Sequence, residues 1–487
     1  MNWWHDQSVF PQGLLNDKVT CLRRSQYIDE NFVGQSGEFF QMWRNELNNY
    51  KVSKQSFENF KLLQNKEALV ITTGQQGSIA GGPLLVFYKA LSCVQQAQYL
   101  TIQMKRPVVP VFWIAGDDSD FDECNQFENL SKDQGFQFTN VLRKVNEPVS
   151  KVRLSDSDIN EWKLFLSKNE LSNQSVMEQK LSDYFEHSNS LVEAFGHLIA
   201  QIFSNEGLLI IDGGGYAVRS CESKILSSFL SQHDSIQKEL NTQSGFLKTK
   251  NINTQVPLDP SKIRLFELVG GVRVRVYQGM SVDAQCIVHD ALSRPFLLEG
   301  LFPILGHVLG PAELKYFALV QKLFPLLKIQ SPLVIKRTNL TLIRRLDLKL
   351  SRELEVDPSE ILTWTYSKIA SEIISAKYHS EIKSLSTQKW NWPEHSSISE
   401  KVRSKLDFKK GKLFNQLIES QKKEWLAHSI ETRTRSKEVS LWFASGRVQE
   451  RVMNIFEAVQ FFNISYLKRS IDALSEEHQL ILEPINE

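Results

Sequence analysis

Apolar positions follow two different patterns along the chain. In the first part, short continuous runs rich in branched residues end at glycine or at a polar residue, in the ranges 68–73, 108–115, 208–212 and 332–336. Continuous runs of this kind are typical of parallel strands buried on both faces, and the helical patterns between them predict the crossover connections. We therefore predict an α/β fold with a doubly wound core.

Two segments interrupt this core pattern. The polar stretch from about 144 to 200 has helical spacing and is expected to form a first insertion. The range 263–276 alternates apolar and polar residues around Gly270-Gly271, which predicts an antiparallel hairpin inside a second insertion at about 244–290. The core with both insertions is expected to span residues 1–355.

Past residue 355 the composition changes to helix formers, with Lys and Glu abundant and little glycine. Apolar residues fall there at heptad spacing, which is typical of a coiled coil. We expect residues 356–487 to form a helical coiled-coil domain, with the loop Trp390–Pro393 between two antiparallel helices. The heptad seam comprises Val402, Leu406, Leu413 and Leu417, and the partner helix carries Leu362, Ile369, Ile373 and Ile382.

Composition narrows the class of protein. A net charge of +1 over 487 residues gives no basic field for a polyanion, which argues against nucleic-acid binding. No apolar run reaches the roughly 18 residues needed to span a bilayer, and the first residues do not resemble a targeting signal. The five cysteines are widely spaced without a CxxC pair, which suggests neither a zinc site nor a disulfide framework. A soluble, cytoplasmic protein is expected.

A glycine-rich loop follows the first predicted strand and leads to Pro83, a residue suited to a helix start. Small residues before a helix let backbone amides approach a phosphate or carboxylate, and glutamine side chains would add donors. A merely flexible turn is the alternative, and the loop lacks the Lys-Ser or Lys-Thr of a Walker motif. The candidate anion-binding residues are Thr73, Gly74, Gln75, Gln76 and Gly82.

Five carboxylates in seven residues, from Asp117 to Glu123, follow the second predicted strand. The carboxyl ends of strands are where open α/β sheets bind ligands. Carboxylates at such a place can bind Mg²⁺, accept protons or hold a substrate ammonium group. A solvated acidic turn is the alternative. The candidate catalytic residues are Asp117, Asp118, Asp120 and Glu123.

Two further patterns give weaker indications of a functional site. Gly213-Gly214-Gly215 follows the third predicted strand and is either a phosphate loop or a simple turn. The ten histidines include no HxxxH or HExxH pair, so no histidine-based metal site is predicted.

Several blocks together resemble the bacillithiol biosynthesis cysteine-adding enzymes, and the likeness extends over nearly the whole chain. The blocks are Thr73–Gln76 with Gly82–Leu84 and Tyr88-Lys89, Pro110–Ala115 leading into Asp118–Glu123, Gly310–Glu313 with Tyr316-Phe317, and Gly446 with Gln449–Arg451.

The resemblance implies a Rossmann-like core with inserted connecting segments and a coiled coil that forms a homodimer. It implies a ligase that joins cysteine to the amino group of glucosaminyl-malate, with ATP expected to activate the carboxylate and Mg²⁺ as a further cofactor. In this interpretation the acidic residues hold an ammonium group or a metal ion, and one takes a proton from the amine. Lys89 supplies a positive charge, unless it is a solvated surface lysine. Ser119 and Asn125 are counted with the substrate-binding residues.

The chain departs from the family pattern at four positions. Histidine is usual at the positions of Ser119 and Gln126, arginine at Glu299 and glycine at Leu309. Loss of two imidazoles removes groups suited to proton transfer near neutral pH, and Glu299 reverses a charge. The alternatives are therefore a catalytically weakened binding scaffold, or a ligase with another amino-sugar substrate.

Overall fold

The structure of the chain is a computed structural model that describes residues 6, 8–10, 18–129, 134–168, 176–219, 224–254, 256–283, 286–361, 364–387, 400–443, 448–459, 462–471 and 478–482. It divides into two compact units. The first comprises Met1–Glu128, Gly135–Leu340 and Asn454–Gln479; the second comprises Asn129–Gln134, Thr341–Met453 and Leu480–Glu487.

The first unit is built on a five-stranded parallel sheet, which confirms the predicted α/β class. The sheet comprises β1 (Leu69–Gln75), β2 (Val108–Ile114), β5 (Leu209–Asp212), β9 (Ile304–Leu309) and β10 (Leu333–Lys336), in the order β10-β9-β1-β2-β5. Four of these strands match the predicted runs. β9 was not predicted, because Gly306 and His307 interrupt its apolar run. The order runs outward from β1 in both directions, as in a Rossmann-like sheet.

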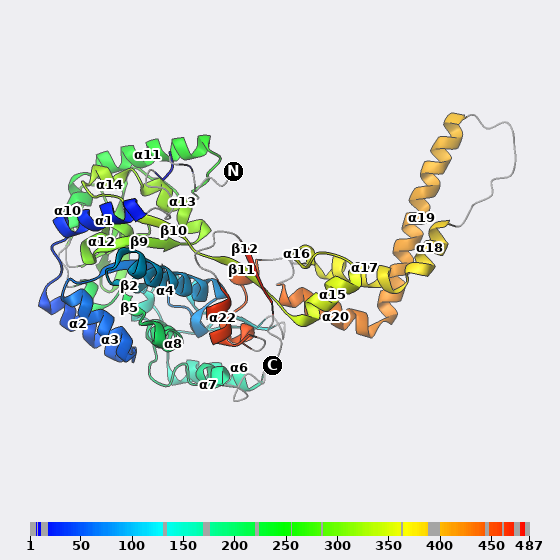
Figure 1. The fold of residues 1–487 in the computed structure, drawn as a ribbon, viewed down its shortest axis with the longest axis horizontal. Helices are drawn as coiled ribbons and strands as arrows, with labels where there is room; N and C mark the ends of the chain where they lie inside the picture. Colours follow the sequence, from blue (N-terminus) through cyan, green and yellow to red (C-terminus); the bar gives the residue numbers. More distant parts are fainter. Residues whose placement is uncertain are drawn as a thin grey trace. The chain divides into compact units, whose positions relative to one another are not determined.

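Side chains of the strands alternate between two hydrophobic cores, because successive residues of a strand point to opposite faces. Leu333 and Ile335 pack with α1 (Lys18–Asn31) and α4 (Leu84–Met104), whereas Val334 packs with residues of α11 (His233–Thr249) and α13 (Pro311–Val320). Figure 1 shows α4 lying along the sheet, where it contacts β1 and β2. Both faces of the sheet are therefore covered by helices.

Two long connections carry the insertions. Between β2 and β5 lie α5 (Phe121–Cys124), β3 (Gln126–Asn129), β4 (Gln134–Gln137), α6 (Asp156–Lys168), α7 (Val176–Ser182) and α8 (Leu191–Ile202). Between β5 and β9 lie α9 (Tyr216–Arg219), α10 (Lys224–Ser231), α11, β6 (Lys262–Val269), β7 (Val272–Tyr277), β8 (Ile287–His289) and α12 (Arg294–Leu301).

The predicted hairpin is present as β6 and β7, paired antiparallel. Gly270 and Gly271 in its turn have φ values of +59° and +86°, a backbone conformation that favours glycine. β8 pairs with the other edge of β6.

The remaining elements complete both units. Those of the first unit are α2 (Gly37–Asn49), α3 (Lys54–Gln64), α14 (Leu323–Leu326), α21 (Ile455–Ala458) and α22 (Ile464–Ser470). Those of the second are α15 (Arg345–Leu354), α16 (Pro358–Ile361), α17 (Tyr366–Lys377), α18 (His379–Thr387), α19 (Glu400–His428) and α20 (Ile430–Trp442). Two strands, β11 (Asn339–Ile343) and β12 (His478–Leu482), lie where the chain passes between the units. Within the described residues, no helix is both long and apolar enough to cross a bilayer.

The second unit is helical, but a coiled coil is not confirmed. α19 runs continuously through Gly411, and α17 contacts both α19 and α20. Ile369 and Ile373 of α17 are buried, whereas Leu413 and Leu417 of the predicted seam are 63% and 56% exposed. The predicted Leu362 and the loop Trp390–Pro393 lie outside the described residues, as do the side chains of Val402 and Leu406.

Candidate active site

The predicted polar segments meet at the carboxyl edge of the sheet. β1, β2, β5 and β9 are parallel, so the residues that follow them lie along one edge. The strand order reverses direction between β1 and β9, which is the place where open α/β sheets bind ligands. The candidate site is built around this edge.

Lys89 connects the loop after β1 to the start of α13. Its Nζ lies 2.9 Å from the carbonyl oxygen of Gly74, 2.7 Å from Oε1 of Gln75 and 2.9 Å from Oε2 of Glu313. Lys89 is only 4% exposed, so it is not the solvated lysine of the alternative interpretation. Because protein oxygens take its hydrogen bonds, Lys89 positions Gln75 instead of offering a free charge to a ligand.

The glycine-rich loop differs from the expected helix-start geometry. β1 continues to Gln75, a buried turn at Ile79–Gly81 follows, and α4 begins only at Leu84. Gly74 and Gln75 therefore end a strand and do not lie at a helix N-terminus. Gly82 has a φ of +70° in the approach to α4, and Thr73 donates its hydroxyl to the carbonyl of Val308 at 2.9 Å. Both residues shape the backbone.

Asp118 is held by three contacts. Arg273 Nη1 lies 2.7 Å from Oδ1 of Asp118, Gln76 donates Nε2–H to Oδ2 at 3.2 Å, and the Ser119 amide donates to Oδ1 at 2.7 Å. Burial alone would raise the pKa of Asp118, but Arg273 and Arg294 outweigh it and hold that pKa below its usual range. Asp118 is therefore a fixed, ionised carboxylate at neutral pH.

The other acidic candidates have separate surroundings. Asp117 is 3% exposed, and its Oδ1 lies 3.6 Å from Nη2 of Arg294. Asp120 caps α5 by accepting the amide of Glu123 at 3.1 Å, which is a structural task. Partial burial raises the pKa of Glu123, and the charges of Asp120 and Asp118 raise it further, so Glu123 is the better proton acceptor near neutral pH.

Asn125 is 1% exposed and donates Nδ2–H to the carbonyl of Phe138 at 3.0 Å. That bond links the end of α5 to the segment after β4, so this side chain does not lie at the surface of the edge.

Arg273 was not found by sequence reasoning. It comes from β7 of the hairpin, 155 residues from Asp118. The guanidinium groups of Arg273 and Arg275 lie 4.0 and 3.6 Å from the ring centroid of Phe266, which orients both side chains by cation–π contact. The alternating pattern of β7 placed these two arginines on one face, which was the available signal.

A second acidic pair was also missed. Burial raises the pKa of Asp212, at the end of β5, to about 7, and burial raises that of Glu46 in α2 to about 8. Glu46 Oε1 accepts the amide of Ala217 at 3.1 Å, and Asp212 Oδ1 accepts that of Gly214 at 2.9 Å. Each side chain thus fixes the turn after β5.

Gly213–Gly215 form a tightly packed turn. A Cβ atom on Gly213 would lie 2.4 Å from Cζ2 of Trp113, one on Gly214 2.3 Å from Oγ of Ser150, and one on Gly215 2.4 Å from Oε1 of Glu46. Glycine is required here because protein atoms fill the space, which favours the simple turn over a phosphate loop.

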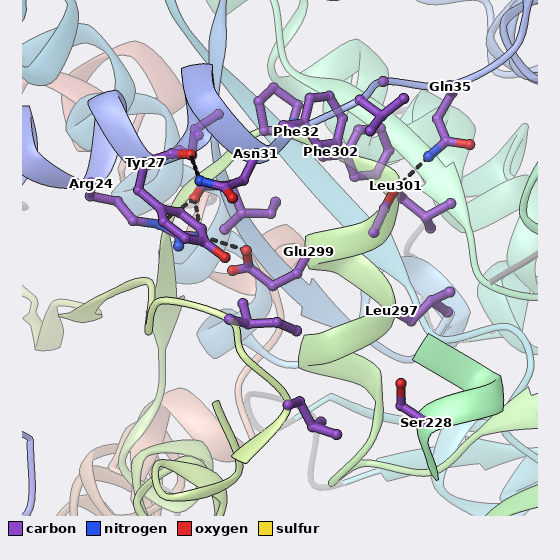
Figure 2. Close-up of a pocket in the computed structure, with 18 residues that line it drawn as sticks. Arg24, Tyr27, Asn31, Phe32, Gln35, Ser228, Leu297, Glu299, Leu301 and Phe302 are labelled. Atoms are coloured by element: carbon purple, nitrogen blue, oxygen red, sulfur yellow. Dashed lines mark hydrogen bonds and ion pairs between the residues drawn. The ribbon is translucent and has the colours of Figure 1, made fainter. Parts of the chain in front are cut away.

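Glu299 lies away from the acidic residues. It forms an ion pair with Arg24 next to the amino end of β9, where Arg24 also donates to the carbonyl of Ile304. Both residues line a pocket of about 430 Å³, and Figure 2 shows the contact between them. Glu299 therefore lies at the opposite end of the strands from the acidic residues, so its reversed charge does not act at the carboxyl edge.

Chemically, the carboxyl edge offers an ionised carboxylate, a carboxylate with a raised pKa and several arginines. Among the described residues, no group of three His, Cys, Asp or Glu side chains is arranged to hold a metal ion. The arrangement can orient an amine, accept its proton and stabilise an anionic group.

Comparison with known proteins identifies relatives. The sequence model described as bacillithiol biosynthesis BshC, N-terminal Rossmann-like domain, matches residues 20–285 and 277–338. Proteins named putative cysteine ligase BshC from Bacillus cereus (strain AH187) and Bacillus anthracis (strain CDC 684 / NRRL 3495) are each 25% identical over 367 residues, which cover 70% of this chain and 67% of the relative.

A solved structure described as a putative arginyl t-RNA synthetase from Campylobacter jejuni aligns with 85% of this chain and 98% of its own, at 9% identity and a TM-score of 0.26. A structural overlap of that size identifies neither a common fold nor a common function.

Proposed function

Because the chain belongs to the bacillithiol biosynthesis BshC family, we propose that it is a ligase that joins the carboxyl group of cysteine to the amino group of glucosaminyl-malate. The names of the relatives support ligase chemistry. The observation that carries the proposal is Asp118, an ionised carboxylate held by Arg273 and Gln76 at the carboxyl edge.

In amide formation these residues would have different roles. The amine nitrogen forms a bond to the cysteine carbonyl carbon, the bond from that carbon to an oxygen leaving group breaks, and the amine loses a proton. Asp118 attracts the amino group, and Gln75 and Gln76 orient it. Glu123 takes the proton, because its raised pKa makes it the stronger base of the two acids.

ATP remains the expected cosubstrate and would supply the activation of the carboxylate. We assign no residues to ATP, because protein side chains fill the Gly213–Gly215 turn. We likewise assign no ligands to Mg²⁺, since the described residues hold no group of three suitable side chains.

The test is a mass-spectrometric assay of purified protein with ATP, Mg²⁺, cysteine and glucosaminyl-malate. We expect a product whose mass equals the sum of the two substrates less one water, and none when either substrate is omitted. Absence of both product and ATP turnover would refute the ligase. Binding of glucosaminyl-malate without turnover would favour the scaffold alternative, which the departures at Ser119 and Gln126 motivate. If product forms only with another amino sugar, the ligase acts on a different substrate.

We also propose a cytoplasmic homodimer formed through α19. Its apolar residues Leu413 and Leu417, which lie one turn apart on the same helix face, are 63% and 56% exposed, and exposed apolar residues on one face are suited to association with a second copy. Leu413→Asp together with Leu417→Asp should halve the mass measured by light scattering. Lys412→Asp, in the same helix, is the control, and an unchanged mass in the double variant would contradict the dimer.

A further inference from the structure

We propose that polar side chains at the carboxyl ends of β2 and β5 form a subsite for a free α-amino acid, bound as its zwitterion. This inference rests on the proposed function, under which the amino acid is cysteine. We call these residues the inner polar cluster: Trp113, Asp117, Ser150, Asp212, Arg219 and Arg294.

Glycine lets these side chains converge. A Cβ atom on Gly213 would lie 2.8 Å from Cε2 of Trp113 and 2.9 Å from Oδ1 of Asp117, and one on Gly116 would lie 2.2 Å from Oδ1 of Asp212. The Ser150 amide donates to the carbonyl of Gly116 at 2.9 Å, which places the Ser150 hydroxyl beside the same turn. The absent side chains of Gly116 and Gly213 thus let polar groups from three separate segments converge, around residues 113–117, 150 and 212.

Several buried polar atoms of the inner polar cluster lack hydrogen-bond partners. The donors among them are Nε1 of Trp113, Nε and Nη2 of Arg219, and Nε of Arg294; the acceptors are Oδ1 of Asp117 and Oγ of Ser150, a hydroxyl that can also donate. Trp113 and Asp117 are 2% and 3% exposed. A buried polar atom without a partner destabilises the protein, so such atoms are normally satisfied by a ligand or water. Their concentration around one turn indicates a binding site.

The charges select the kind of ligand. Asp117, together with the ionised fraction of Asp212, would repel a phosphate or a dicarboxylate, whereas Arg219 and Arg294 would repel a simple amine. A zwitterion satisfies both sets, because its carboxylate accepts from arginine and the Trp113 N–H while its ammonium group donates to the aspartates. Arg219 and Lys151 also act on Asp212 electrostatically and favour its ionised form.

The same edge thereby holds two substrates. Gln75, Gln76 and Asp118 lie on the side of β1 and take the amino sugar, while the inner polar cluster lies between β2 and β5 and takes the amino acid. Asp117 and Asp118 are consecutive residues, so the cysteine carboxyl group and the acceptor amine would meet across them.

The first test uses the unaltered protein and calorimetric titration of three probes. L-Cysteine carries both charges, cysteamine lacks the carboxylate and 3-mercaptopropionate lacks the ammonium group. We expect L-cysteine to bind at least tenfold more tightly than either analogue. If one analogue binds as tightly as L-cysteine, the zwitterion subsite is refuted.

The second test compares two tryptophans. Trp113→Phe removes the N–H with little change of shape and should weaken L-cysteine binding about tenfold, the equivalent of 1.4 kcal/mol. Trp162→Phe is the matched control, because Trp162 Nε1 is also buried and unpaired but lies among Phe127, Phe136 and Phe165. An unchanged L-cysteine affinity in Trp113→Phe would overturn the assignment.

The two proposals can fail separately. If the ligase assay yields no product but the probe order and the tryptophan comparison hold, the subsite stands without the reaction. If product forms and Trp113→Phe raises the KM for glucosaminyl-malate but not for cysteine, the ligase stands and the subsite is wrong.

Discussion

The two edges of the central sheet both bury charged side chains, but they use them differently. At the amino edge, Arg24 donates through Nε, Nη1 and Nη2 to two backbone carbonyls and Glu299, so its hydrogen bonds stay within the protein. At the carboxyl edge, Trp113, Arg219 and Arg294 keep buried donors without partners. The first arrangement stabilises the fold, whereas the second leaves polar groups for a ligand.

The amino edge is not fully satisfied. Oε1 of Glu299 and Nε2 of His307 are buried without hydrogen-bond partners and lie 3.9 Å apart. These two atoms face each other, although Glu299 also lines the pocket shown in Figure 2. The two edges therefore differ in what their unpaired buried atoms face. The following variants test this difference.

The largest expected effect is on activity at the carboxyl edge. Asp118→Asn removes the charge that faces the amine and should lower kcat/KM about 10³-fold, in the range seen when a preorganised electrostatic contact is lost. The thermal midpoint should also fall, because Arg273, whose side chain is 5% exposed, loses its anionic partner, so kcat/KM is compared per folded molecule. Asp122→Asn is the control in the same acidic run, where Asp122 makes only a surface pair with Arg143. Equal activity in both variants would remove Asp118 from the mechanism.

At the amino edge the large effect should be on stability. Arg24→Met leaves Glu299 buried without its cation and should lower the free energy of unfolding by about 3 kcal/mol. Urea denaturation measures this loss, and turnover per folded molecule should stay near that of the unaltered protein. Arg106→Met, which breaks an exposed pair with Asp29, should cost less than about 1 kcal/mol. A large loss of turnover in Arg24→Met would contradict the division between the edges.

The buried carboxyl group at the amino edge should also make the stability of the protein depend on pH. Burial raises the pKa of Glu299 from 4.5 to about 7, so the folded protein binds more protons than the unfolded chain in that range. The contribution of Glu299 is therefore complete below pH 4.5 and is lost as the pH rises through about 7.

Glu299→Gln should remove that decline of about 3 kcal/mol, measured as the fall in unfolding free energy between pH 4.5 and 7. Glu67→Gln, at an exposed position, should leave the slope as it is. A slope unaffected by Glu299→Gln would show that Glu299 keeps an ordinary pKa in the folded protein.

The smallest expected effect tests the contact between α4 and the loop after β1. Lys89→Met frees Gln75 and should lower kcat about tenfold through misplacement of that side chain. Because Lys89 acts through Gln75, the double variant with Gln75→Ala should be no worse than Gln75→Ala alone. Additive losses would mean that Lys89 has a separate role, for example through Glu313.

The two glycine-rich turns at the carboxyl edge have similar local sequences but contain glycine for different structural reasons. Both turns follow core strands and are similar in composition. Gly74 and Gln75 end β1 beside Lys89, whereas Gly213–Gly215 are glycines because Trp113, Ser150 and Glu46 occupy the space beside them. The local sequence of each turn does not show which reason applies, because the residues that pack against the turn come from distant parts of the chain.

The sequence alone determined the α/β class, four of the five core strands, the hairpin and the edge at which the acidic residues gather. These follow from periodicity and turn residues, which act over a few neighbouring positions. The tertiary structure decided that Arg273 meets Asp118, that Lys89 is buried, that Glu46 and Asp212 have raised pKa values, and that Glu299 lies at the opposite edge. These depend on burial and on charges brought together from far along the chain, and neither is encoded in local spacing.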